Sequence, residues 1–401
     1  MLRYNPFIVN LLYHKADMLA RLKTSDKCAH CGQIVFFEIL CYTVCKTKSV
    51  QEIGMIKPKH LEKGDKVAIV SLSRGFLGEP WAIHKLHIAK TRLENDFGLQ
   101  VVVMPNALKG VDYLYEHPEA RASDLMKAFR DTSVKAIFNA IGGDDTIRLL
   151  PYIDFDVIRE NPKIFTGFSD TTSNHFMMYR AGLMSYYGAA VMTNFSEYVK
   201  INDYTLDTIR KTLFEPQPTF EIPSAPYWYD DEDEKIWWSE DNINTLKPYH
   251  KEEIGYEIIQ GSGIAEGRLF GGCVDVFLEL LGTPLWPSVE EWKDKILFLE
   301  TSEEDMSCNH LTWILRNLQA QGIFDVISGI IVGKPARRSK YEPYKEVFRK
   351  VVGKEAKHPE LPIMFNVNFG HAEPIGVLPY GALCRLDADQ KKLILMESAT
   401  S

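Results

Sequence analysis

The chain has 401 residues, of which 45% are hydrophobic and 25% are charged, and its formal net charge is −8. This composition is typical of a globular protein of two or three domains, with a core large enough to need no disulfide bonds. The acidic balance excludes a general nucleic-acid-binding role, and no apolar run reaches the roughly 20 residues that span a bilayer. The N-terminus shows no secretory signal pattern, so we expect a cytoplasmic enzyme with neither nucleic acid nor a membrane as partner.

The first 54 residues differ from the rest of the chain. They contain four of the seven cysteines, with the spacing C-x2-C-x9-C-x3-C, which could form a small zinc site. The four are Cys28, Cys31, Cys41 and Cys45. The alternative is that residues 1–54 are an extension of doubtful relevance, because they show no hydrophobic period. Met55 then opens "MIKPKHLEKGDKVAIVSLS", which resembles a natural start leading into a first strand.

From Lys66 onward, apolar segments alternate with helical patterns. Strands are predicted at 66–72, 99–105, 135–143, 163–168 and 183–190, and helices at 81–97, 118–131, through Leu149 and Leu150, and at 170–181. Strands that alternate with helices and are apolar on both faces indicate a parallel sheet covered on both sides. Ligands bind such sheets outside the carboxyl ends of the strands. We therefore predict an N-terminal domain over residues 55–200, with a ligand site at the carboxyl ends of its strands.

Residues 196–255 interrupt this alternation, because they are rich in proline, acidic and aromatic residues. A solvated linker is one interpretation. The adjacent Trp237 and Trp238 favour a lid over a binding site, so we predict a linker and lid over 201–255. A second α/β region follows over 256–401, and its end has the pattern of a hairpin.

The stretch 164–172, "IFTGFSDTT", ends an apolar strand and places Ser169 at the start of a helix. Serine is a good helix N-cap, which is one explanation. The other is a nucleophile held on a sharp strand-to-helix turn. The "IGGDD" turn at 141–145 follows a neighbouring strand and belongs to the same rim of the sheet, which favours the nucleophile.

A serine nucleophile needs a base and an acid that orients the base. His371 directly follows the strand-like segment "IMFNVNFG", which places it at a strand end. Glu300 ends the strand "KILFLE", and we assign it the orienting role. Glu303 is the second choice, because the acids after Ser302 fit a capped first turn of a helix. His175 and His310 are interpreted as structural.

The oxyanion that forms in acyl transfer requires two backbone N–H donors. The amide of Asp170, at the predicted helix N-terminus, is one candidate. The glycine turn can supply the other through Gly143 or Asp144, because glycine lets the backbone approach a reacting carbonyl closely.

Five segments together resemble the LD-carboxypeptidase family of serine peptidases, which includes muramoyl-tetrapeptide carboxypeptidases and microcin C self-immunity peptidases. They are "AIGGDDTIRLLPYIDFDVI", "PKIFTGFSDTT", "GRLFGGCVDVFLELLGTP", "KILFLETSEE" and "NFGHAEPIGVLPYGALCRLD". The resemblance implies the triad Ser169, Glu300 and His371. It also implies an α/β fold with a flavodoxin-like N-terminal domain, a smaller C-terminal α/β domain and the site between them, in a homodimer without metal or cofactor.

The long insert and the "IGGDDTIRLLPYIDF" segment resemble the microcin-immunity branch more than the murein-recycling branch. The implied substrate is thus an aminoacyl-nucleotide or a small peptide such as a murein LD-tetrapeptide. Cys273 departs from the family, which usually has asparagine there, near the substrate. Two alternatives remain: an α/β-hydrolase esterase, although Thr171 replaces the glycine of its elbow, and a non-catalytic peptide- or nucleotide-binding protein.

Overall fold

The computed structural model describes residues 54–229 and 238–401, which belong to one compact unit ending at Ser401. The four cysteines of the possible zinc site and Trp237 lie outside the described residues. Across the described part of the chain, no helix has both the length and the apolar character needed to cross a membrane.

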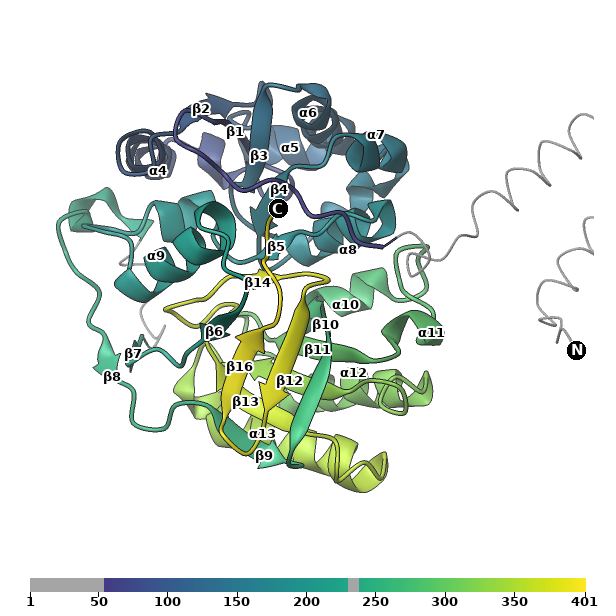
Figure 1. Cartoon of the computed structure of the whole chain (residues 1–401). Coiled ribbons are helices and arrows are strands. Elements are labelled where there is room, and N and C mark those ends of the chain that lie inside the picture. The colour runs from purple at the N-terminus through teal and green to yellow at the C-terminus, as the bar shows by residue number, and fades with distance from the viewer. Residues whose placement is uncertain (1–53, 230–237) are drawn as a thin grey trace, which may run out of the picture. The chain divides into compact units, whose positions relative to one another are not determined.

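The first sheet has six strands in the order β14-β5-β4-β3-β1-β2 (Figure 1). They are β1 (Lys66–Val70), β2 (Gln100–Val103), β3 (Val134–Asn139), β4 (Ile164–Gly167), β5 (Tyr186–Tyr187) and β14 (Leu378–Pro379). Strands β1 to β5 are parallel, and β14 joins β5 in the antiparallel sense. The order 2-1-3-4-5 is that of flavodoxin-like folds, so the predicted fold class is confirmed.

Helices connect these strands, as the alternating pattern predicted. They are α4 (Ile83–Asn95), α5 (Val111–Glu116), α6 (Pro118–Arg130), the 3-10 helix η2 (Thr146–Tyr152), α7 (Phe155–Glu160) and α8 (Thr171–Ala181). Helices α5 and α7 were not predicted, because six residues are too few to show a helical period.

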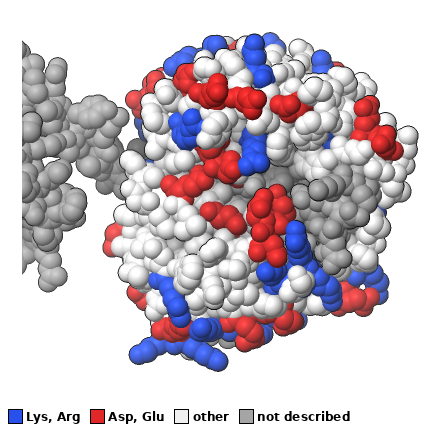
Figure 2. Space-filling view, turned by 180° about the vertical axis from the view of Figure 1, so that it is seen from behind, with Lys and Arg blue, Asp and Glu red and all other residues white. Residues whose placement is uncertain are grey.

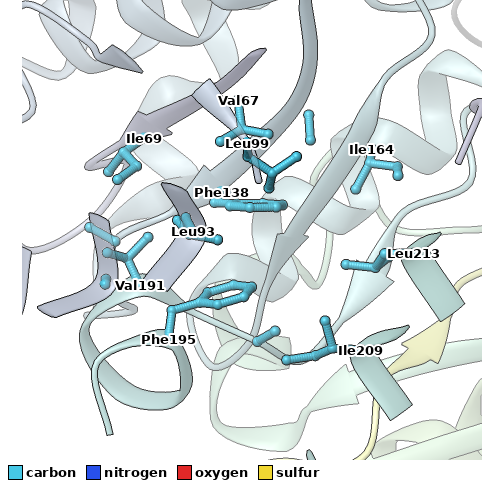
Figure 3. Packing of buried hydrophobic residues seen from close by; sticks show 14 of the residues in the cluster. Val67, Ile69, Leu93, Leu99, Phe138, Ile164, Val191, Phe195, Ile209 and Leu213 are labelled. Atoms are coloured by element: carbon cyan, nitrogen blue, oxygen red, sulfur yellow. The ribbon is translucent and has the colours of Figure 1, made fainter. Parts of the chain in front are cut away.

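The hydrophobic core of this first region contains residues of the β-strands. Residues of a turn of π-helix, η3 (Val191–Phe195), pack against them. Figure 3 shows Val67 and Phe138 of the sheet facing the same apolar cluster as Phe195. The Phe138 and Phe195 rings stack with centroids 5.1 Å apart. This packing holds the strands in place and so fixes the positions of their carboxyl ends.

The second sheet has eight strands in the order β6-β16-β15-β10-β11-β12-β13-β9. They are β6 (Phe220–Ile222), β9 (Glu257–Gln260), β10 (Ile264–Cys273), β11 (Lys295–Glu300), β12 (Gly329–Gly333), β13 (Ile363–Val367), β15 (Leu383–Asp387) and β16 (Lys392–Leu395). Strands β10 to β13 are parallel. The predicted C-terminal hairpin is present as the antiparallel pair β15 and β16.

Five α-helices belong to the described residues of the second half of the chain, and a short ribbon lies in the predicted linker. The helices are α9 (Asp203–Ile209), α10 (Val274–Leu280), α11 (Val289–Trp292), α12 (Cys308–Ala320) and α13 (Tyr341–Phe348), and the ribbon pairs β7 (Tyr227–Trp228) with β8 (His250–Lys251). Two segments far apart in the sequence also pair with distant strands. The predicted linker supplies β6, which pairs with β16, while the C-terminal region supplies β14 to the first sheet.

One local prediction is wrong. The acids after Ser302 do not form the first turn of a helix, because α12 begins at Cys308 and its N-cap is Ser307. The Ser307 side chain accepts the His310 N–H, which satisfies one of the free donors at the helix start. Glu303 therefore lies in a loop, where its carboxylate is free to contact the site.

Candidate active site

Ser169 occupies a sharp turn between β4 and α8. Its φ of 63° lies in the left-handed region, which is uncommon for a residue with a side chain. Such strain is characteristic of a nucleophile elbow, where it exposes the hydroxyl above the strand end. Gly142 makes room for this turn: a Cβ there would lie 2.7 Å from Ser169 Cβ and 2.9 Å from Ser169 Oγ.

His371 and Glu300 form a buried pair at the ends of the second sheet. His371 Nδ1 lies 2.7 Å from Glu300 Oε2, and the two side chains are 8% and 0% exposed. The His371 ring also packs edge-on against Phe168, with centroids 5.2 Å apart. Because Phe168 directly precedes Ser169, the predicted base lies beside the predicted nucleophile.

Tyr187, at the end of β5, connects the elbow to the acid. Its hydroxyl accepts the backbone N–H of Ser169 at 3.1 Å and donates to the Glu300 carboxylate. Burial raises the pKa of Tyr187 well above its ordinary value, and the neighbouring Glu300 adds to this, so the phenol keeps its proton. Tyr187 was not predicted, because nothing in a single sequence marks which tyrosine connects residues of two sheets.

A second carboxylate contacts the other side of the imidazole. Glu303 Oε2 lies 3.1 Å from His371 Nε2. Burial alone would lower the pKa of His371, but Glu300 and then Glu303 outweigh it and raise the pKa to about 10. Ser169 Oγ makes no hydrogen bond with His371 among the described residues, so the structure shows a resting arrangement in which Nε2 faces Glu303. Hydrogen bonds of this kind commonly tighten only when substrate binds.

The predicted oxyanion donors face the elbow from two strand ends. Gly143 follows β3 with a φ of 155°, and a Cβ there would lie 2.2 Å from Ser73 Oγ and 2.9 Å from the backbone nitrogen of Arg74. Only glycine fits that space. The backbone N–H of Asp170 stands at the start of α8, and neither it nor the Gly143 N–H donates to an acceptor within the described ranges.

The side chain of Asp170 holds these loops together. Its Oδ2 accepts hydrogen bonds from Ser73 Oγ, from the backbone N–H groups of Asp145 and Thr146, and from Thr146 Oγ1. The residue is fully buried, and burial raises the pKa of the carboxyl despite these bonds. Asp170 thus contributes an amide to the site and fastens the loops after β1 and β3 to the elbow.

Ser169, His371 and the glycine turn line one cavity of about 560 Å³. This volume is in the usual range for sites that bind small molecules. Figure 2 shows acidic and basic side chains side by side across the middle of one face of the protein. The lining of the cavity is likewise mixed, with an aromatic part and an acidic part.

The aromatic part contains Trp238, which the sequence predicted to be near the substrate. Its ring packs edge-on against Trp81, with centroids 6.2 Å apart. Lys85 Nζ lies 3.9 Å from the centroid of the Tyr198 ring and 5.4 Å from that of Trp238. Burial, followed by the nearby Lys247, lowers the pKa of Lys85 to about 7. Lys85 and Tyr198 were not predicted.

The acidic part contains Asp144, Asp275, Glu279 and Glu304. Asp144 pairs with Arg74, whereas Glu279 has a buried carboxylate oxygen without a hydrogen-bond partner among the described residues. Burial, followed by the surrounding aspartates, raises the pKa of Glu279 to about 7. This part of the cavity therefore carries a local excess of negative charge.

Cys273, which the resemblance marks as a departure from the family, ends β10 beside Glu300 of β11. It is 1% exposed and lines the cavity. Its backbone N–H donates to Thr172 Oγ1 at 3.1 Å, and its thiol donates to Asp275 Oδ2 at 3.4 Å. His175, in contrast, is a buried structural residue, which contacts Ser185 Oγ and the Gly167 carbonyl oxygen.

Two family models match the chain. The LD-carboxypeptidase N-terminal domain matches residues 67–188, and the LD-carboxypeptidase C-terminal domain matches residues 266–386. The first match contains the elbow and the glycine turn. The second contains Glu300 and His371.

Sequence relatives and solved structures point to the same family as the two family models. The chain is 30% identical to the microcin C7 self-immunity protein MccF of Escherichia coli over 70% of this chain and 79% of that protein. It is 31% identical to the putative carboxypeptidase YocD of Bacillus subtilis over 82% of this chain and 95% of the relative. An MccF-like protein from Streptococcus pneumoniae, solved in complex with AMP, has a TM-score of 0.76 and 33% identity, covering 83% of this chain and 98% of its own.

Proposed function

The chain belongs to the LD-carboxypeptidase family of serine peptidases, and we propose that it hydrolyses an amide bond through Ser169, His371 and Glu300. The scissile bond lies next to a carboxyl-terminal or nucleotide-linked group. One observation carries this proposal: a strained serine elbow shares a cavity with a histidine that is hydrogen-bonded to a buried glutamate.

The first half of the reaction forms an acyl-enzyme. Substrate displaces the Glu303 carboxylate from His371 Nε2, and the Nε2 proton passes to solvent because one of the charges that held it is removed. The neutral ring then accepts the proton of Ser169 Oγ at Nε2 as that oxygen attacks the carbonyl carbon. The backbone N–H groups of Asp170 and of Gly143 or Asp144 stabilise the oxyanion. Collapse of the intermediate breaks the C–N bond, and His371 gives its proton to the leaving nitrogen.

The second half releases the acid. Water attacks the acyl carbon while His371 takes its proton, and the Oγ–C bond breaks with return of a proton to Ser169. Glu300 holds the ring through Nδ1 in both halves. Tyr187 is a positioning residue, because it touches the Ser169 amide and the Glu300 carboxylate rather than the substrate.

The aromatic part of the cavity favours an aminoacyl-nucleotide as the substrate class. Trp238 offers an indole face, and stacking of a base on an aromatic ring contributes about 1–3 kcal/mol. Similar proteins of known structure include MccF in complex with aspartyl sulfamoyl adenosine, with a TM-score of 0.74 and 26% identity, covering 86% of this chain and 100% of that one. A murein LD-tetrapeptide, the second candidate, has no ring to stack on Trp238, and the putative carboxypeptidase relatives support it.

The decisive experiment compares these two substrates. Purified protein is incubated with an aminoacyl sulfamoyl or phosphoramidate adenylate and, separately, with an LD-tetrapeptide, and products are identified by mass spectrometry. The Trp237→Ala/Trp238→Ala variant should raise KM for the nucleotide substrate about 10–100-fold, because each 1.4 kcal/mol of lost stacking is about tenfold. It should change KM for the tetrapeptide little.

A matched control is Trp313→Ala, since Trp313 is 59% exposed and does not line the cavity. This change should leave both KM values as they are. Equal effects of the double variant on both substrates, or cleavage of the tetrapeptide alone, would contradict the nucleotide-linked substrate class and favour the murein peptide.

A further inference from the structure

Three potential metal ligands converge at the catalytic centre. Cys273 and Glu300 are register partners on the neighbouring parallel strands β10 and β11, so their side chains leave adjacent strand ends. His371 is hydrogen-bonded to Glu300. A ligand atom of each of the three lies within 4.8 Å of the others, and among the described residues no other group of cysteine, histidine and acidic side chains meets this arrangement.

The chemistry of this trio suits zinc. Zn²⁺ binds cysteine sulfur, histidine nitrogen and carboxylate oxygen, and takes four ligands at about 2.0–2.3 Å in a tetrahedron. Ligand atoms around such an ion are about 3.5 Å apart. His371 Nδ1 and Glu300 Oε2, now 2.7 Å apart, therefore have to separate by roughly 1 Å, while the Cys273 sulfur lies within 4.8 Å of a ligand atom of each. Water can supply the fourth ligand, because Cys273 and His371 both line the cavity.

The surroundings attract a cation to this point. Asp275, Glu279 and Glu304 line the same cavity, and the two carboxylates nearest the triad, Asp275 and Glu303, contact Cys273 and His371 respectively. Acidic side chains grouped in one part of a cleft raise the local concentration of cations there. These acids therefore favour entry of a divalent cation, and they are separate from the three ligands themselves.

We propose that Zn²⁺ binds Cys273 Sγ, Glu300 and His371 and thereby inhibits the enzyme. Binding replaces the thiol proton of Cys273 and the proton shared by His371 and Glu300, both of which pass to solvent. The metal then occupies the imidazole that must accept the Ser169 proton, so the bound and active states exclude each other. The inhibition rests on the proposed function, whereas the binding does not.

Cys273 supplies the sulfur ligand of this site. An asparagine amide in its place offers no thiolate and is a poor zinc ligand. The Cys273→Asn variant is thus the natural comparison. Loss of a ligand should weaken binding at least as much as loss of an outer-shell partner, which costs about 10–100-fold.

The test uses Co²⁺ as a spectroscopic probe and Zn²⁺ as the inhibitor, with the full chain. Because the N-terminal cysteines offer other thiolates, every protein carries serine at all four of those positions. They are Cys28, Cys31, Cys41 and Cys45. We expect one Co²⁺ with a thiolate charge-transfer band, displaced by Zn²⁺, and loss of turnover with the same midpoint as the displacement.

Cys273→Asn should abolish the charge-transfer band. It should also raise the Zn²⁺ concentration that halves the variant's own metal-free rate at least about tenfold. Cys308→Ser, which alters a partly exposed cysteine outside the cavity, should change neither. Absence of the band in the parent protein, or its persistence after Cys273→Asn in a protein with an unchanged unfolding temperature, would overturn the proposal. A Cys273-dependent band in a protein that hydrolyses neither substrate would instead contradict the proposed function and leave the metal site standing.

Discussion

The imidazole of His371 lies between two carboxylates, and this controls when it can act as a base. With its pKa raised to about 10 by Glu300 and Glu303 against the effect of burial, the ring carries two protons at neutral pH in the resting state. Only the neutral ring can accept the serine proton. The ascending limb of kcat/KM against pH, which reports the free enzyme, should therefore extend above neutral pH.

Replacing Glu303 should shift the ascending limb of the kcat/KM profile along the pH axis. Glu303→Gln removes one of the two charges that hold the proton, so the pKa of His371 falls and the neutral form appears at lower pH. We expect the midpoint of the kcat/KM profile to move down by roughly one pH unit, a modest effect because solvent reaches Glu303. Glu304→Gln, at the exposed neighbour, is the control and should leave the midpoint in place. A shift to higher pH would show that Glu303 does not hold the proton on the ring.

Side chains differ in how far the sequence could predict their place. Ser169 follows a strand of the first sheet, whereas Glu300 ends one strand of the second sheet and His371 follows another, so apolar patterns were sufficient to predict that each lies at a strand end. That the two sheets meet at these ends was implied by the resemblance. Tyr187 and Lys85 lie within ordinary strand and helix patterns. Their partners lie more than 100 residues away in the sequence: Tyr187 contacts Glu300, and Lys85 contacts Tyr198. No local pattern encodes such contacts.

At the scale of elements, the elbow is held by hydrogen bonds between loops as well as by the sheet. Asp170→Ala would leave the donors of Ser73, Asp145 and Thr146 without their acceptor in a buried site. Each unsatisfied buried donor costs about 1–3 kcal/mol, so we expect the variant to lose roughly 2–4 kcal/mol of stability after partial relaxation. The difference in thermal unfolding between the wild-type protein and Asp170→Ala measures this loss of stability.

Activity of Asp170→Ala should fall as well, because the glycine turn is no longer tied to the elbow. Asp156→Ala is the comparison, since that side chain is 70% exposed and only pairs with Arg159 on the surface. It should change stability by less than about 1 kcal/mol. Equal unfolding temperatures of the two variants would mean that the Asp170 carboxylate does not fasten the loops.

Element prediction succeeded where length and period were clear and failed where they were not. Strands β1 to β5 of the first sheet and helix α8 followed from apolar runs and alternation, whereas the two-residue strand β14 was not predicted. The six-residue helices α5 and α7 were too short to show a period. The acids after Ser302 have the composition of a helix start, but the chain first forms a loop and the helix begins at Cys308.

At the scale of the whole molecule, the described unit begins close to Met55. The segment 56–61 is bound to distant parts of the chain: Ile56 exchanges backbone hydrogen bonds with Gly182 and Met184, and the Leu61 N–H donates to the Leu213 carbonyl oxygen. A shortened chain that starts at Met55 keeps these bonds. We expect it to match the full chain in turnover and in thermal unfolding.

A chain that starts at residue 62 is the control, because it loses those hydrogen bonds and the buried side chain of Leu61, which is 2% exposed. It should unfold at a clearly lower temperature. If the full chain alone lost stability cooperatively on addition of a chelator, residues 1–54 would instead contribute a zinc site. The resemblance could not decide this, since its motifs all lie after Met55.

The proposed mechanism depends on Ser169 as the nucleophile, and the turnover of the Ser169→Ala variant tests this role. The serine, base and acid act as a unit, so removal of the hydroxyl should lower kcat at least about 10⁴-fold on whichever substrate the wild-type protein cleaves, while the unfolding temperature stays the same. A folded Ser169→Ala variant that retains a tenth or more of wild-type kcat would contradict the account.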